Sequence, residues 1–280
     1  MKIKILSDST CDLSAQLLEQ NDITLVPLTV VKGDEQFKDG VTITPADIFA
    51  HVAAGGALCS TAAVSIGEYE DVFAGCCADY DGVILVNIGS GFSACHQNAL
   101  LAAEEFPNVR VIDSQSLTTG QGLIVLEACR LAKEATDLDQ LADALREYAT
   151  RVEASFLLSR LEYMVKGGRC SAAKALGANL LNLKPCIEVK DGKMTIVKKY
   201  RGNFDKALAM YVKDRLADRD DLVGDTLFIT STPVDEDCRA AVEKAVKEHG
   251  KFDTVYTTTA GCTVSCHCGP GTLGVIFVRK

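Results

Sequence analysis

The sequence predicts an α/β protein with two domains: an N-terminal parallel sheet flanked by helices, and a C-terminal α/β domain with a mixed sheet that includes a β-hairpin. Strand and helix patterns alternate through the first half, which is the order of a parallel sheet covered by helices. In the second half, Asp191-Gly192 between two strand patterns indicates a tight hairpin and therefore antiparallel pairing. A chain of 280 residues fits two domains, which we expect at residues 1–153 and 154–280.

The elements of the first half follow from their start and stop signals. Strand patterns cover residues 2–6, 24–30, 82–87 and 109–112, the first ending in a turn or cap cluster of serine, threonine and aspartate. Helices are expected after Thr44-Pro45, Ser65, Ala94, Gly120 and Asp137. Ser65 with Glu68 three residues later predicts a capping box, and Asp137 with Gln140 predicts the cap of a further helix.

The second half mixes strand and helix patterns less regularly. Strands are expected at residues 155–159, 186–190, 194–200, 226–231, 253–258 and 273–278. Helices are expected at residues 161–166, 203–217 and 233–249, the last capped by Thr232 with Pro233 at its first position. Residues 261–271 are interpreted as a loop between two strands, because they contain three glycines and a proline.

The charge and hydropathy of the chain argue against a nucleic-acid partner and against a membrane-spanning segment. The formal net charge of −9 and the absence of a basic stripe argue against a nucleic-acid partner. No run reaches the roughly 18 apolar residues of a membrane span, and the first residues lack the apolar segment of a secretory signal. We therefore expect a cytoplasmic protein that does not span a membrane, with transient contact at a membrane surface left open.

Twelve cysteines are scattered through helix and strand patterns, which predicts reduced and buried thiols rather than disulfides. One cluster, Cys262, Cys266, His267 and Cys268, resembles a metal site at first sight. Its spacing is not that of a standard zinc motif, and no second Cys-x-x-Cys or His-x-x-x-His completes a tetrahedral shell. We expect no metal, and the sequence leaves the role of the three cysteines open.

Residues 84–94 run from an apolar strand through a small-residue turn into a helix. Such a turn presents backbone N–H groups and a positive helix end, which suit an anionic group. Gly89, Gly91 and Ala94 also match a dinucleotide-binding fingerprint, with Asp113 closing the next strand as the acidic residue for a ribose. A nucleotide- or NAD-dependent enzyme is therefore one hypothesis, although the usual fingerprint follows the first strand of the chain. The alternative is a turn that only lets the strand and the helix pack closely.

Three polar side chains invite a chemical interpretation. Ser93 as a nucleophile with His267 as its base would suggest an esterase, but the segment lacks the final glycine of the G-x-S-x-G motif. Ser93 and Thr61 equally fit hydroxyls that satisfy free N–H groups near a helix start. His267, in a segment fixed by Gly-Pro-Gly, could donate to a carboxylate or could be a satisfied core histidine.

Five segments of the chain resemble, in order, the motifs of the DegV family. They are residues 7–13 (SDSTCDL), 89–94 (GSGFSA), 111–114 (VIDS), 161–169 (LEYMVKGGR) and 267–271 (HCGPG). The resemblance spans essentially the whole chain. It implies a two-domain bacterial protein that holds one long-chain fatty acid in a tunnel between its domains.

The resemblance also implies a role in phospholipid metabolism. The family's binding subunit of fatty acid kinase presents the acyl carboxylate to a separate ATP-using subunit, which makes acyl phosphate; we therefore expect no catalysis by this chain and no cofactor. The residues at the family's carboxylate-binding positions are Thr61, Ser93 and His267. We add the backbone N–H of Ala94 as a further donor and take His267 as a charge-assisted partner.

Two arginines match positions that the resemblance assigns to docking of the kinase subunit, namely Arg169 and Arg201. A structural or regulatory interaction protein without any small ligand remains a third hypothesis beside the lipid carrier and the nucleotide-dependent enzyme.

Overall fold

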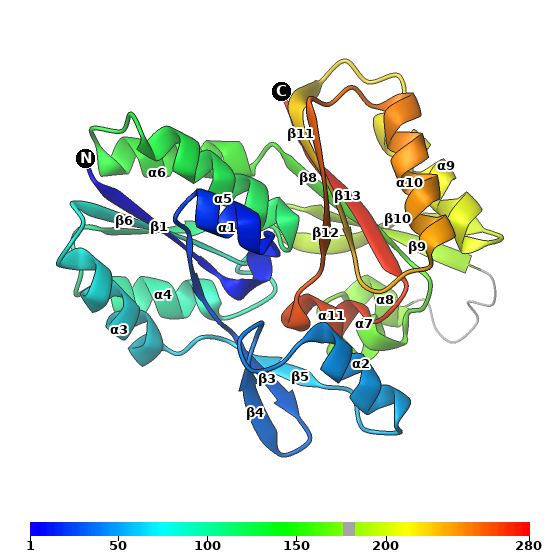
Figure 1. Ribbon diagram of the computed structural model, residues 1–280, viewed down its shortest axis with the longest axis horizontal. Coiled ribbons are helices and arrows are strands. Elements are labelled where there is room, and N and C mark those ends of the chain that lie inside the picture. The colour runs from blue at the N-terminus through cyan, green and yellow to red at the C-terminus, as the bar shows by residue number, and fades with distance from the viewer. Residues whose placement is uncertain (176–182) are drawn as a thin grey trace.

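The computed structural model describes residues 1–175 and 183–280, and the first of its three sheets is parallel throughout (Figure 1). The sheet has the order β2-β1-β6-β7. Its strands are β1 (Ile3–Asp8), β2 (Thr24–Val26), β6 (Gly82–Asn87) and β7 (Val109–Asp113). All six residues of β6 are buried, as expected of a central parallel strand covered on both faces. The predicted N-terminal parallel sheet is confirmed.

Helices cover both faces of this sheet (Figure 1). On one face lie α5 (Thr119–Ala132) and α6 (Leu138–Ala149), and on the other lie α3 (Ile66–Cys77) and α4 (Cys95–Ala103). The predicted capping box of α3 is present, and Asp137 accepts from the N–H groups of Asp139 and Gln140 at the start of α6. A 3-10 turn, η1 (Ser9–Cys11), and the short helix α1 (Ala15–Gln20), which the sequence reading missed, follow β1.

The second sheet is mixed and has the order β10-β9-β8-β13-β11-β12. Its strands are β8 (Val152–Leu158), β9 (Leu183–Lys190), β10 (Lys193–Arg201), β11 (Leu222–Ser231), β12 (Thr254–Thr259) and β13 (Thr272–Arg279). The β9–β10 hairpin turns at Asp191 and Gly192, which have φ of 50° and 68° and so fit a primed turn. The predicted hairpin and mixed sheet are confirmed.

Alternate residues of this second sheet face opposite sides. Leu157, Leu227 and Phe277 pack against α9 (Phe204–Leu216) and α10 (Glu236–His249). Their neighbours along the same strands, such as Phe156, Phe228 and Ile276, join the core that also contains β1, β6 and α5. Because one face of the sheet is turned to the N-terminal half, the interface between the halves is largely apolar.

A small antiparallel sheet, β4-β3-β5, lies beside α2 (Pro45–Ala53) and below the two larger sheets in Figure 1. Its strands are β3 (Thr29–Lys32), β4 (Glu35–Lys38) and β5 (Ser60–Ala62). The prediction of one strand at residues 24–30 was wrong, because the chain divides around Pro27, which has no N–H for a ladder, into β2 and β3. The sequence reading also missed β4 and β5.

Two further predictions were wrong. Residues 262–268 form a helix, α11 (Cys262–Cys268), not part of a loop. Helix α10 begins at Glu236 after Asp235, not at Pro233, because the Thr232 hydroxyl accepts from the Thr272 N–H at 3.0 Å instead of capping a helix. The predicted domain boundary after residue 153 falls after the second residue of β8, and the division into two domains stays a prediction.

Two short helices, α7 (Glu162–Gly167) and α8 (Ser171–Ala175), complete the elements of the described chain. Within residues 1–175 and 183–280, no helix combines the length and the apolar character needed to cross a bilayer.

Candidate functional site

An apolar cavity of about 50 Å³ lies where the β6–α4 turn meets β5, α7 and α11. Leu28, Phe92 and Met164 are among its apolar lining residues. Its polar lining comes from a few side chains contributed by distant parts of the chain: Thr61, Ser93, Arg169, Thr263 and His267. A mainly apolar wall with a few convergent polar groups is typical of a small-molecule site.

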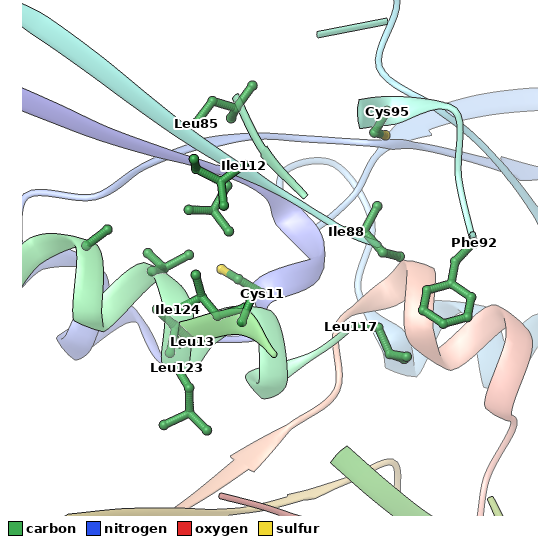
Figure 2. Packing of buried hydrophobic residues seen from close by; sticks show 14 of the residues in the cluster. Cys11, Leu13, Leu85, Ile88, Phe92, Cys95, Ile112, Leu117, Leu123 and Ile124 are labelled. Atoms are coloured by element: carbon green, nitrogen blue, oxygen red, sulfur yellow. The ribbon is translucent and has the colours of Figure 1, made fainter. Parts of the chain in front are cut away.

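A second cavity of about 30 Å³ adjoins the first on the side of the mixed sheet. The two share Leu117, Val264 and Cys268 as lining residues, and the second reaches Phe156 and Ile276. Figure 2 shows Phe92 and Leu117 beside α11, at the end of the core that extends from β6 and α5. We call the first cavity the head cavity and the second the deep cavity.

Thr61 and His267 meet at the head cavity although they are 206 residues apart in the chain. Thr61 lies on β5, opposite Val30 of β3, and His267 lies in the last turn of α11. The hydroxyl oxygen of Thr61 is 2.9 Å from Nε2 of His267. The pairing of β5 with β3 positions the Thr61 hydroxyl, and the short helix α11 positions the His267 imidazole. Together they bring these two hydrogen-bonding groups into contact.

His267 is uncharged at neutral pH in this structure. Burial lowers the pKa of its imidazole to about 4, and the nearby charge of Arg169 acts in the same direction. Its Nδ1 atom is buried and has no hydrogen-bond partner among the described residues. A Cβ at Gly167 would come within 2.5 Å of that nitrogen, so α7 packs directly against the ring. A carboxylate beside the ring would raise the pKa again, because it stabilises the imidazolium.

Ser93 lines the head cavity and also shapes the start of α4. Its hydroxyl accepts from the Cys95 N–H at 3.2 Å and lies 3.2 Å from the Cys95 sulfur as a donor. The imidazole of His267 contacts Thr61 and not Ser93, so the pair is not arranged as nucleophile and base. Ala94 is exposed and does not line the head cavity; its N–H as a ligand donor stays a prediction.

The glycines of the fingerprint serve the fold in this structure. A Cβ at Gly91 would overlap the carbonyl oxygen of Gly192, so Gly91 lets the β9–β10 turn approach closely. Asp113 accepts from the Ser90 N–H at 3.0 Å and the Ser90 hydroxyl at 2.6 Å, which holds the turn. The space above the turn is therefore taken by the hairpin, and the geometry disfavours a dinucleotide there.

The two arginines differ in their relation to the cavity. Arg169 is exposed, lines the head cavity and donates to the Gly167 carbonyl at 2.8 Å. Arg201 is exposed at the end of β10 and lines neither cavity. The sequence reading missed Met164 and Met194, which line the head cavity from α7 and β10. In the sequence, Met164 could have been assigned to the site only because it lies in the motif that ends at Arg169. For Met194, the sequence offers only its position in the predicted hairpin.

The cysteine cluster is buried in α11. Cys262 and Cys266 pack with Val30, Ile48 and Cys59 in a separate apolar cluster, and burial raises the pKa of Cys262 to about 12. Cys268 faces the other way and lines both cavities. In the described part of the chain, no three histidine, cysteine or acidic side chains are grouped so as to hold a metal ion. These thiols act as small apolar residues.

Comparison with known proteins gives a consistent set of relatives. The family model described as "Uncharacterised protein, DegV family" matches residues 2–280. A DegV domain-containing protein of Clostridium acetobutylicum is 33% identical over 100% of this chain and 99% of its own length.

Solved structures show the same fold. A DegV family protein from Thermus thermophilus, described by its fatty acid binding, superimposes with a TM-score of 0.90 at 27% identity and full coverage of both chains. A stearic acid-binding protein from Eubacterium ventriosum gives a TM-score of 0.83 at 26% identity, covering 99% of this chain and 98% of its own.

Proposed function

Because the chain belongs to the DegV family, we propose that it binds one long-chain fatty acid between its two larger sheets. The carboxylate lies in the head cavity at Thr61, Ser93 and His267, and the acyl chain runs past Leu117 into the deep cavity. Fatty acid binding by similar structures supports this assignment of ligand class.

One observation carries the proposal for this chain: hydrogen-bonding side chains converge at the head cavity, which shares apolar lining residues with the deep cavity. The Thr61 hydroxyl and His267 Nε2 lie 2.9 Å apart, and Ser93 lines the same cavity. A buried carboxylate needs such donors, because an unpaired charge is expensive in an apolar surrounding. A long apolar tail in turn needs the apolar wall that continues behind them.

The acyl chain supplies most of the affinity. At about 0.8 kcal/mol per methylene, an acyl chain of about 14 methylenes gains about 11 kcal/mol before the costs of association. Hydrogen bonds to the carboxylate add about 1.5–3 kcal/mol each. The tail therefore sets the strength of binding, and the head contacts set the direction in which the ligand lies.

The passage widens when the ligand enters. The head and deep cavities of about 50 and 30 Å³ are smaller than a long acyl chain, so side chains between them must rotate. Met164 and Met194 line the head cavity, and methionine adapts its shape at low cost.

The proposal extends to a partner. The chain presents the carboxylate to a separate fatty acid kinase subunit that makes acyl phosphate, and it is not itself an enzyme. Exposed Arg169 at the head cavity fits a contact at the point where the carboxylate is presented, and exposed Arg201 offers a second cation on β10. The anionic phosphate donor and the acidic head both favour a cationic rim.

Mass spectrometry of lipid extracted from the purified protein tests the ligand. We expect a long-chain fatty acid in about equimolar amount. Thermal unfolding with palmitic acid, NAD or ATP added to delipidated protein gives the comparison, since only a ligand of the native state raises the midpoint. No fatty acid in the extract together with no shift by palmitic acid would refute the proposal, and a shift by NAD alone would favour the nucleotide-dependent enzyme.

A further inference from the structure

Two buried aspartates hold the start of the helix that carries His267. Asp39 follows β4 and is 4% exposed, and Asp12 follows η1 and is 8% exposed. Neither forms an ion pair with a lysine, arginine or histidine among the described residues. Both carboxyl groups instead bond to N–H and hydroxyl groups, and several of these donors belong to the start of α11.

Asp39 makes four hydrogen bonds, three of them to α11. It accepts from the N–H groups of Cys262 and Thr263 at 2.9 and 3.1 Å and from the Thr263 hydroxyl at 2.6 Å. Its fourth donor is the Ser9 hydroxyl at 3.0 Å, which itself accepts from the Leu28 N–H. Thr263 and Leu28 both line the head cavity, so Asp39 links two walls of the site.

Asp12 bonds to the backbone N–H group that directly precedes the two bonded to Asp39. It accepts from the Gly261 N–H at 2.9 Å and from the Thr118 hydroxyl at 2.5 Å. A Cβ at Gly261 would lie 2.7 Å from one Asp12 oxygen and 3.6 Å from one Asp39 oxygen, so both carboxyl groups reach the same point of the backbone. Three successive N–H groups, at residues 261–263, are thus bonded to side chains of the N-terminal half.

We propose that Asp39, assisted by Asp12, is a positioning residue that fixes α11 so that its last turn places the His267 imidazole against Thr61. The helix has only seven residues, about 10 Å, and its sequence of cysteine, threonine, valine and serine has weak helix propensity. Its placement therefore depends on contacts at its ends. The carboxyl groups bind one end to the same half of the molecule that supplies Thr61 and Ser93.

The proposal rests on the proposed function only for its ligand-binding readout, because the Thr61–His267 contact joins two side chains of this chain. Its first test uses imidazole ¹H–¹⁵N spectra of the ligand-free protein over a pH series. The His267→Gln spectrum identifies the signal of His267 among the four histidines. Wild-type His267 is expected to titrate near its pKa of about 4.

Two variants disturb the aspartate contacts in different ways. Asp39→Asn places an amide N–H₂ group against donors, and Gly261→Ala keeps every hydrogen-bonding group but pushes the helix start away from Asp12. In both we expect the pKa of His267 to move toward its ordinary value of about 6.5, because the ring leaves its buried place beside Thr61. If Asp39→Asn does not fold, Gly261→Ala alone decides the question.

Asp137→Asn is the matched control. It makes the same change at the start of α6, where Asp137 accepts from the Asp139 and Gln140 N–H groups at 2.8 and 3.0 Å, and asparagine caps as well as aspartate. The control should leave His267 unchanged. A folded Asp39→Asn or Gly261→Ala protein whose His267 titrates as in the wild type would overturn the proposal, even if that protein is less stable.

Ligand binding gives the second readout. Dissociation constants for palmitic acid and for 1-hexadecanol separate head contacts from tail burial. We expect Asp39→Asn to weaken binding of the acid about tenfold, the loss of one hydrogen bond to a charged group, and to leave the alcohol within about twofold. Equal weakening of both ligands would contradict the positioning role. If wild-type protein binds neither, the proposed function fails, and the imidazole spectra still decide the role of Asp39.

Discussion

The head and deep cavities contain similar side chains but differ in what their polar atoms bond to. In the head cavity, the Thr61 hydroxyl and the His267 imidazole bond to each other across the interface, and Nδ1 of the ring has no partner within the described residues. In the deep cavity, the Thr230 hydroxyl lies 2.7 Å from that of Thr119 and 2.9 Å from that of Thr258. The Thr232 hydroxyl there accepts from a backbone N–H at 3.0 Å.

A cavity wall that contains several hydroxyls can therefore still be apolar to a ligand. The Thr230 and Thr232 hydroxyls of the deep cavity are bonded to other hydroxyls or to the backbone, so they offer little hydrogen-bonding capacity to an acyl chain. The head groups keep hydrogen-bonding capacity that a carboxylate can use. One passage therefore has a polar end and an apolar end although threonines lie at both.

The largest effect is expected from closing the passage between the two ends. Leu117 lines both cavities, and Leu117→Trp should stop an acyl chain there. Each excluded methylene costs about fourfold in affinity, so an 18-carbon acid should bind more than a hundredfold more weakly while an 8-carbon acid changes little. Dissociation constants measured for acids of 8 to 18 carbons check this.

Leu101→Trp on α4, where the leucine is 41% exposed, is the control for the substitution itself. If the Leu117→Trp protein still gains affinity with every added methylene up to 18 carbons, the acyl chain does not take this route, and the division into head and deep ends is wrong.

Removing the head hydroxyls should have the next largest effect. Thr61→Ala with Ser93→Ala deletes two donors to the carboxylate, and at about 1.5 kcal/mol for each hydrogen bond we expect about 100-fold weaker binding of palmitic acid. Binding of 1-hexadecanol should change less than about threefold. Ser90→Ala is a matched control, since that hydroxyl lies in the same turn but donates to Asp113. Unchanged palmitic acid affinity in the double variant would remove both hydroxyls from the site.

Local spacing was enough to predict much of this architecture. The capping box at Ser65 and Glu68, the strand into the Gly89 turn and the hairpin at Asp191-Gly192 depend on neighbours within a few residues, and all three are present. The loop predicted around His267 is a helix because its backbone is fixed by Asp39 and by Asp12, more than 220 residues earlier. No local pattern contains that information.

The candidate site was predictable only through resemblance. Thr61 and His267 are 206 residues apart, and periodicity gave no reason to bring them together. Spacing alone left a dinucleotide at Gly89 and Gly91 as a hypothesis, because it could not show that the hairpin occupies the space above Gly91. Tertiary contacts of this kind distinguish a ligand-binding turn from a packing turn.

A smaller effect on palmitic acid affinity is expected from a change of pH, and it arises in the head cavity. The pKa of His267 is about 4 without ligand, and a bound carboxylate raises it. The complex therefore holds more protons than the free protein, so affinity should rise as pH falls, by at most tenfold per unit. Palmitic acid binding from pH 8 to pH 6 checks this, with His267→Gln expected to flatten the curve. Equal slopes in both proteins would assign the pH dependence to another group.

The smallest effect on binding is expected from removing a hydroxyl of the deep cavity. This substitution gives the clearest comparison between the head and deep cavities. Thr230→Val keeps the shape of the side chain but leaves the Thr119 and Thr258 hydroxyls without their shared partner. The free energy of unfolding should fall by about 1–3 kcal/mol, measured by urea denaturation, while palmitic acid affinity stays within about twofold. Thr61→Val makes the same exchange in the head cavity. There the loss in free energy of palmitic acid binding should exceed the loss in free energy of unfolding, because the Thr61 hydroxyl bonds to the ligand. A Thr230→Val protein that lost affinity as strongly as the Thr61→Val protein would show that the acyl chain bonds to hydroxyls along its length, and the contrast between a polar head and an apolar passage would not hold.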